Sequence, residues 1–180
     1  MLQIRQATIQ DAPSIAPLIY EAIGDIANQL TNQTTVDGAI AGIQTLIEQT
    51  NNRHTYLNTY VAEENGKLLG VVVLYDGATG NRLDAEHARA YKIDIDAEAH
   101  DDEYYIDTIC VHPDARGQGI GTRLLAFAED TGRTKGYKKL SLNVELEKIK
   151  AKKLYERMGF VVTEPWTIIG EPFHHMVKEI

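Results

Sequence analysis

The stretch VHPDARGQGIG, residues 111–121, places three glycines at alternate positions directly after an arginine. Glycine has no side chain to cover the main chain, so a ligand can approach the backbone N–H groups of this stretch closely. If a helix begins here, its first N–H groups lack partners within the helix and suit a phosphate or pyrophosphate. Arg116 and Arg123 add positive charge. This glycine segment therefore predicts an anion cradle.

Two common nucleotide sites fit the glycine segment less well. A P-loop needs a lysine followed by serine or threonine, and neither is present here. A dinucleotide site has the spacing GxGxxG, whereas this chain has GxGxG. A glycine-rich turn without a ligand would leave the neighbouring arginines unexplained. We therefore favour a phosphate cradle of another kind.

A strand and a helix must hold the glycine segment in place. Residues 104–111, YYIDTICV, are rich in β-branched and aromatic side chains, which predicts a strand that leads into the segment. Apolar residues at helical spacing follow it, and KKLSLNV at residues 138–144 predicts the next strand. Two strands joined by one helix predict a parallel pair with a right-handed crossover. The apolar positions of the helix are Ile120, Leu124, Phe127 and Ala128.

A second stretch whose residues could do chemistry, KIKAKKLYERMGF, occupies residues 148–160. Its apolar residues fall on one face of a predicted helix, and Gly159 is expected to end that helix. Tyr155 lies on the same face. A tyrosine in this place is either a proton donor or a packed core side chain.

Together, the two stretches resemble the GNAT superfamily of acyl-CoA-dependent N-acetyltransferases. The family pattern RxxGxG follows a strand end and a proline, and the matching positions are Val111, Pro113, Arg116, Gly119 and Gly121. A second pattern, LYxxxGF, is met by Leu154, Tyr155, Gly159 and Phe160. The resemblance is close over residues 104–161 and follows the order of elements over residues 2–75. It says nothing of residues 81–103.

The resemblance implies a single domain over residues 1–180 with an acyl-CoA-binding core at residues 104–161. We expect an α/β fold with a mixed, mostly antiparallel sheet of about six to seven strands. Its central parallel pair should be splayed apart, with about four flanking helices. Amphipathic stretches at residues 12–27 and 34–50 predict the first two helices. Asn65-Gly66 predicts a hairpin.

The resemblance also implies that acetyl-CoA binds as the acyl donor. Its pantetheine arm is expected to pair like an added strand with the backbone of Ile109, Cys110 and Val111. Asn143 is expected beside the pantetheine or the substrate. Lys148 stands where the family often has asparagine, and it either meets a cofactor phosphate or is solvated. Within the glycine segment, the residues expected to bind the cofactor are Arg116, Gly117, Gln118, Gly119, Ile120, Gly121 and Thr122.

Tyr155 and Asp107 are the expected catalytic residues. By resemblance, Tyr155 is the general acid that protonates the departing thiolate. An alkyl amine is protonated at neutral pH, so a carboxylate must take its proton before it attacks the thioester. Asp107 interrupts an apolar strand, which is costly unless the carboxylate is paired or functional. A structural hydrogen bond explains Asp107 equally well, and Glu103 is the second candidate base.

Composition excludes several classes of function. A formal net charge of −8 argues against a nucleic-acid surface, and no run approaches the roughly 20 apolar residues that span a membrane. The single cysteine excludes an internal disulfide, and His174 and His175 lack a third ligand, so no metal is expected. We expect a soluble, cytoplasmic protein. Family members often dimerise through the last strands, so a homodimer is also considered.

The sequence thus predicts an N-acetyltransferase that moves the acetyl group directly to a primary amine of a small molecule or peptide, in a ternary complex. The alternatives are a non-catalytic acyl-CoA-binding or regulatory domain and transfer of a larger acyl group. Residues 81–103 carry eight acids and three bases, which indicates a solvated insertion or a lid that attracts a cation. We expect a cationic acceptor such as a polyamine, an aminoglycoside or a lysine side chain.

Overall fold

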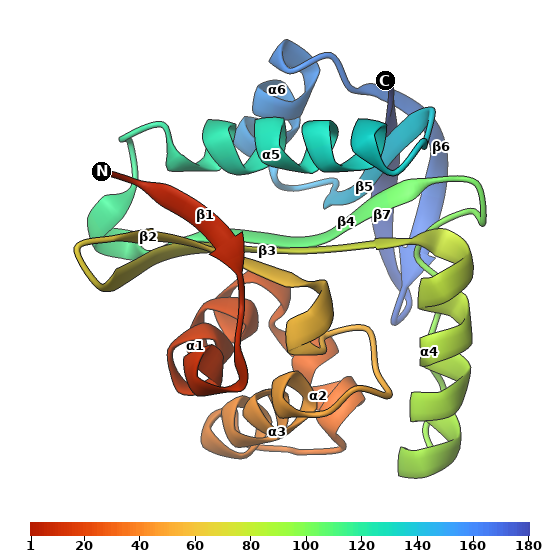
Figure 1. Ribbon diagram of the computed structural model, residues 1–180. Helices are drawn as coiled ribbons and strands as arrows, with labels where there is room; N and C mark the ends of the chain where they lie inside the picture. The colour runs from red at the N-terminus through yellow and green to blue at the C-terminus, as the bar shows by residue number, and fades with distance from the viewer.

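A seven-stranded sheet runs through the middle of the protein, whose computed structural model describes residues 1–180 (Figure 1). The strand order is β1-β2-β3-β4-β5-β7-β6, and every neighbouring pair is antiparallel except β4 with β5. This confirms the expected mixed sheet with one central parallel pair. The strands are β1 (Gln3–Gln6), β2 (Thr59–Glu64), β3 (Lys67–Asp76), β4 (Tyr104–Val111), β5 (Lys139–Glu145), β6 (Val161–Ile168) and β7 (Glu171–Glu179).

Six helices flank the sheet, where about four were expected. Figure 1 shows α1, α2 and α3 on one face of the sheet and α5 and α6 on the other. Two apolar cores result, one under α1–α3 and one around α5. No helix combines the length and apolar character needed to cross a membrane. The helices are α1 (Ala12–Ile23), α2 (Asp25–Thr31), α3 (Val36–Glu48), α4 (Gly77–Tyr91), α5 (Ile120–Thr134) and α6 (Ile149–Arg157).

Most turns and helices of the N-terminal half follow from short patterns of neighbouring residues. Asn65 and Gly66 have φ values of 52° and 75°, and they form the expected turn between β2 and β3. The amphipathic stretch at residues 12–27 forms two helices in place of the expected one. Gly24, which is not helical, separates α1 from α2. α3 forms as expected within residues 34–50.

β4 and β5 part along their length. They form three residue pairs, the last between Ile106 and Leu142, although β4 continues to Val111. The ladder between β3 and β4 shifts register at Asp107, which is an extra residue in β4. A bulge of this kind bends a strand and increases its twist. The parallel pair opens from the bulge onward, which confirms the expected splay.

The acidic segment at residues 81–103, expected to be a solvated insertion or a lid, is solvated only in part. Its first half belongs to α4, and the remainder returns as a loop to the start of β4. Asp84, Glu98 and Glu103 are buried, with relative exposures of 7%, 6% and 2%. Side chains from distant parts of the chain pair with them, as described below. These three carboxylates are therefore part of the interior, whereas Asp94, Asp96, Asp101 and Asp102 are exposed.

The start of α4 packs so closely on this loop that Gly77 has no room for a side chain. A Cβ there would lie 1.9 Å from the backbone oxygen of His100. We expect Gly77→Ala to lower the free energy of unfolding by about 1–3 kcal/mol, measured by urea denaturation. In the control Gly121→Ala, the Cβ would meet only Val111 at 3.7 Å, and the change should stay below about 1 kcal/mol. Equal losses would contradict the close packing of loop and helix.

Candidate active site

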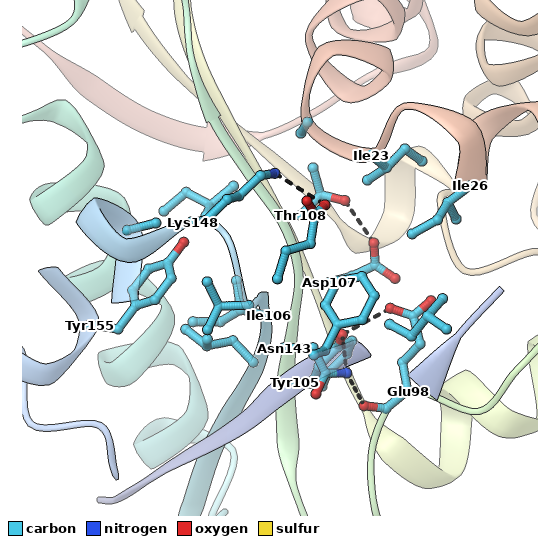
Figure 2. A pocket seen from close by; sticks show the side chains of 18 of the residues that line it. Ile23, Ile26, Glu98, Tyr105, Ile106, Asp107, Thr108, Asn143, Lys148 and Tyr155 are labelled. Atoms are coloured by element: carbon cyan, nitrogen blue, oxygen red, sulfur yellow. Dashed lines mark hydrogen bonds and ion pairs between the residues drawn. The ribbon is translucent and has the colours of Figure 1, made fainter. Parts of the chain in front are cut away.

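A cavity of about 100 Å³ lies where β4 and β5 part (Figure 2). One side of the cavity is lined by Tyr155 of α6 and by Lys148, the residue that precedes α6. Glu98 lines the other side, and in Figure 2 residues of β4 lie between it and Tyr155. The volume corresponds to a few water molecules at about 30 Å³ each. It is suited to a small reacting group rather than to a whole cofactor.

The glycine segment forms an open backbone surface at the start of α5. Gly117 and Gly119 have φ values of 74° and 79°, and a Cβ on either would meet no atom within 4 Å. No side chain caps the N-terminus of α5, so its first N–H groups are available to an anion. This empty, uncapped surface fits the pyrophosphate of acetyl-CoA.

The parted strands also fit the pantetheine arm. Beyond Ile106, β4 has no partner on its β5 side, so its main-chain groups on that side are free to pair with an extended ligand. Ile109 lies on this stretch and lines the cavity. The backbone from Ile109 to Val111 therefore lies on the part of β4 that has no β5 partner.

The basic side chains expected at the cofactor are held by other groups. The Arg116 guanidinium pairs with Glu21 of α1. Arg123 donates to a backbone oxygen near the N-terminus at 3.1 Å. Lys148 Nζ lies 3.4 Å from Glu145 Oε1. In this conformation the favourable potential at the glycine segment comes from the helix N-terminus, while Arg116 and Arg123 bind groups of the protein.

Tyr155 points its hydroxyl toward the cavity (Figure 2). Its ring meets that of Phe160 edge-on at a centroid distance of 6.1 Å, which explains why both residues of the LYxxxGF stretch are aromatic. Burial raises the pKa of the Tyr155 phenol, so the group is protonated at neutral pH. A protonated phenol in this wall can donate to a sulfur atom placed between the parted strands.

Asp107 also lines the cavity, but its carboxylate is fully engaged. Oδ1 accepts from Thr108 Oγ1 at 2.7 Å and lies 3.1 Å from His54 Nε2. Oδ2 accepts from the Tyr75 hydroxyl and lies 3.1 Å from Arg53 Nε. Burial opposes ionisation, but His54 and Arg53 outweigh it and hold the pKa of Asp107 well below its usual range. Such a carboxylate is a weak base, so these contacts favour the structural role.

Arg53 is the centre of a buried charge cluster that the sequence did not reveal. Its side chain is 2% exposed, and its guanidinium pairs with Asp84 at 3.2 Å, with Glu98 and with Asp107. Three carboxylates thus share one arginine. Burial raises the pKa of Glu98 to about 8 and also raises that of Asp84. Three carboxylates beside one guanidinium are an imbalance of buried charge, and the raised pKa of Glu98 relieves it, because that carboxyl can hold a proton near neutral pH.

Asn143 lies in the cavity wall with its amide turned to the protein. Nδ2 donates to the backbone oxygen of Glu98 at 2.8 Å and to Tyr105 Oη at 3.1 Å. Oδ1 lies 2.6 Å from His175 Nδ1. The amide is therefore occupied on the Glu98 side of the cavity, and its polar atoms are not free for the pantetheine contact expected from the sequence.

His175 lies beside His100 and Glu103, two residues of metal-binding type that the sequence did not connect with it. Donor atoms of His100, Glu103 and His175 lie within 4.8 Å of one another. Hydrogen bonds account for this group: His175 Nε2 lies 2.9 Å from Glu103, and Ser141 donates to Glu103 at 2.7 Å. His100 Nε2 lies 3.0 Å from Glu164. Glu103, our second candidate base, is not among the residues that line the cavity.

Comparisons with known proteins show the family of this chain. The model of the Acetyltransferase (GNAT) family matches residues 26–160. The chain is 31% identical over 159 residues to the N-acetyltransferase YhfO of Bacillus subtilis (strain 168), covering 88% of this chain and 89% of that protein. It is 28% identical over 158 residues to the aminoalkylphosphonate N-acetyltransferase of Salmonella typhimurium, covering 88% and 84%. The crystal structure of an N-acetyltransferase from Staphylococcus aureus Mu50 matches with a TM-score of 0.84 at 28% identity, covering 97% of this chain and 99% of that one.

The fold and the site define an acyl-CoA-dependent acyltransferase. The chain belongs to the GNAT family of acetyltransferases, which use acetyl-CoA as cosubstrate. Because its relatives are N-acetyltransferases, the chain is an enzyme, and the alternative of a non-catalytic domain is set aside.

Arg53→Met would leave three buried carboxylates without their counter-charge. We expect the free energy of unfolding to fall by about 3–5 kcal/mol. Arg53 helps to hold the pKa of Asp107 well below its usual range, so its removal raises that pKa, and the loss should grow as the pH rises through the acid range toward neutral. The measurement is urea denaturation at several pH values.

The matched control is Arg5→Met, which removes an arginine that also pairs with two carboxylates, Asp11 and Glu63, but is 40% exposed. Solvent screens this pair, so the expected loss is about 1 kcal/mol or less. A loss in Arg53→Met that does not depend on pH would contradict the proposed imbalance of buried charge.

Proposed function

We propose that this protein transfers the acetyl group of acetyl-CoA directly to the primary amine of a cationic small molecule or peptide, within a ternary complex. The observation that carries the proposal is the single cavity at which the parted strands, Tyr155 and a buried acidic cluster meet. A thioester held along β4 and an amine held by the acidic cluster would be neighbours there. Such proximity favours direct attack.

The environment of Cys110 supports direct transfer. Its side chain packs into the core under α1–α3. Burial raises the pKa of the thiol, which keeps it in its weakly nucleophilic protonated form. A covalent acetyl-cysteine intermediate is therefore disfavoured.

The chain supplies three functions around the thioester, whose C–S bond breaks when acetyl-CoA reacts. Free N–H groups on the β5 side of β4 are suited to donate to the oxygen on which negative charge develops. The N-terminus of α5 holds the pyrophosphate. Tyr155 donates a proton to the departing thiolate.

An acidic opening beside the cavity supports a cationic acceptor. It has a volume of about 530 Å³ and shares Ile23, Ile26 and Phe173 with the cavity. Negative charge at an entrance attracts cations and repels anions. Five carboxylates and one lysine line the opening: Glu21, Asp25, Glu145, Glu147, Glu171 and Lys148.

The test is release of coenzyme A thiol from acetyl-CoA in the presence of a panel of amines. The panel contains polyamines, aminoglycosides and lysine peptides, with an aminoalkylphosphonate and neutral amino acids as contrasting acceptors. We expect release with cationic amines, and salt should weaken it. Release with the aminoalkylphosphonate alone would overturn the cationic class. No release with any amine, although acetyl-CoA binds, would overturn the proposed reaction on these acceptors.

The cytoplasmic location, the homodimer and the absence of a resident metal stay predictions. Transfer of an acetyl group, as opposed to a larger acyl group, is part of the proposal. The cavity of about 100 Å³ supports the small group, because its volume leaves little space for a longer chain.

Gly119→Asp would place a carboxylate and a side chain in front of the pyrophosphate site. We expect the Kd of acetyl-CoA to rise by about tenfold or more, because like charges repel at the N-terminus of α5. The matched control is Gly136→Asp at the other end of α5, where φ is also positive, at 87°, and a Cβ also meets nothing within 4 Å. Calorimetry should give a wild-type Kd for the control. Equal Kd values for both variants would contradict the assignment.

Tyr155→Phe would remove the proposed proton donor and keep the ring. We expect kcat to fall by about two orders of magnitude while the Kd of acetyl-CoA stays nearly unchanged. The matched control is Tyr60→Phe, because Tyr60 is half-buried against Phe127 outside the cavity. Steady-state kinetics on the best amine of the panel and calorimetry give both values. Wild-type turnover in Tyr155→Phe would remove Tyr155 from the mechanism.

A further inference from the structure

The proposed transfer requires a base for the amine, and the cavity offers few candidates. Three carboxylates line it, those of Glu98, Asp107 and Glu145. Asp107 is saturated by its partners, as described above. Glu145 lies toward the entrance, with a side chain 41% exposed and paired with Lys148. Only Glu98 is both buried and incompletely paired.

Resting on the proposed function, we propose that Glu98 contacts the acceptor amine and takes its proton, and that Tyr105 and Asn143 position the Glu98 carboxylate. Glu98 Oε1 accepts a hydrogen bond from Tyr105 Oη at 2.9 Å. Oε2 touches the Arg53 guanidinium but accepts no hydrogen bond from the protein. A carboxylate oxygen has two acceptor positions, and the ion pair with Arg53 leaves one of them open. An ammonium group entering the cavity can donate to that position.

A one-way chain of hydrogen bonds fixes which oxygen of Glu98 remains open. The Glu98 backbone oxygen can only accept, so the Asn143 atom that faces it is Nδ2, and Asn143 also donates to Tyr105 Oη. Tyr105 in turn donates to Glu98 Oε1. Asn143 Oδ1 then accepts from His175 Nδ1. Since an amide does not relay protons readily, this chain orients the carboxylate rather than conducting a proton.

The charges around Glu98 favour the same assignment. The groups that face it are Arg53 after α3, Tyr75 on β3, Asp84 on α4, and Tyr105 and Asp107 on β4, and His54 contacts Asp107. Burial is the largest influence on Glu98 and raises its pKa to about 8, although Arg53 opposes this. Glu98 therefore exchanges a proton near neutral pH, whereas Asp107 stays ionised.

The protons of the reaction balance with these groups. Glu98 takes one proton from the ammonium nitrogen, and the neutral amine forms a C–N bond to the thioester carbon as the C–S bond breaks. Tyr155 gives its proton to the thiolate and recovers one from the nitrogen, which loses its second proton as the amide forms. Glu98 then releases its proton to water, so that one proton leaves for each amide made.

The decisive variant is Glu98→Gln, which keeps the shape and the acceptor for Tyr105. With the best amine of the panel, kcat/KM of the wild type should rise with pH through an inflection at about 8. In Glu98→Gln we expect kcat to fall by about 100-fold. The inflection should move toward the pKa of the free amine, about 10. An unchanged inflection and kcat would overturn the proposal.

A second variant is Asp84→Asn, because Asp84 pairs with the same arginine but does not line the cavity. Its negative charge raises the pKa of Glu98, so its loss should move the inflection to lower pH. Tyr105→Phe should move it to higher pH, because the carboxylate loses a donor. If Glu98→Gln fails to fold, an unmoved inflection in Tyr105→Phe overturns the proposal.

A measurement without any acceptor tests the assignment of Glu98 separately from the proposed function. Infrared difference spectra should show a protonated carboxyl group that titrates at about pH 8 in the wild type and is absent in Glu98→Gln. If this band titrates and no amine is acetylated, the proposed function has failed. If amines are acetylated and the band is missing, the assignment of Glu98 has failed.

Discussion

The separation of β4 from β5 after Ile106 and Leu142 is the constraint on which the rest of the site depends. Unpaired main-chain groups inside a sheet are unfavourable unless another group satisfies them. Here they lie beside an uncapped helix N-terminus and beneath a helix that carries Tyr155. One gap in the ladder thus serves as a cofactor groove and as one boundary of the cavity. The bulge at Asp107 marks where the gap begins.

Buried charge organises the opposite side of the cavity. Arg53 follows α3, while its partners belong to α4, to the loop before β4 and to β4 itself. None of these segments carries its charge alone, because a buried ion without a partner is strongly unfavourable. Their pairing draws the acidic segment at residues 81–103 into the interior. The same pairing leaves three carboxylates to share one arginine, and one of them, Glu98, exchanges its proton near neutral pH.

The sequence predicted features whose determinants are neighbours along the chain. The glycine segment, the strand before it, the hairpin at Asn65-Gly66 and the LYxxxGF helix each depend on a few consecutive residues. The buried cluster depends on residues 53, 84, 98 and 107, which no local pattern connects. An acidic run also looks the same whether its carboxylates face solvent or a buried arginine. Even so, the unusual position of Asp107 in an apolar strand did mark the edge of the cluster.

Much of each side of the cavity is encoded by a different stretch of the chain. The glycine segment and the Tyr155 helix come after β4, whereas Arg53 and the acidic loop come before it. Mutations in the earlier stretches can therefore remodel the acceptor side and leave the acyl-donor groove intact. A gene for such a protein can diverge toward new acceptors by changing one segment, and duplicated copies would retain the same donor while acquiring different substrates.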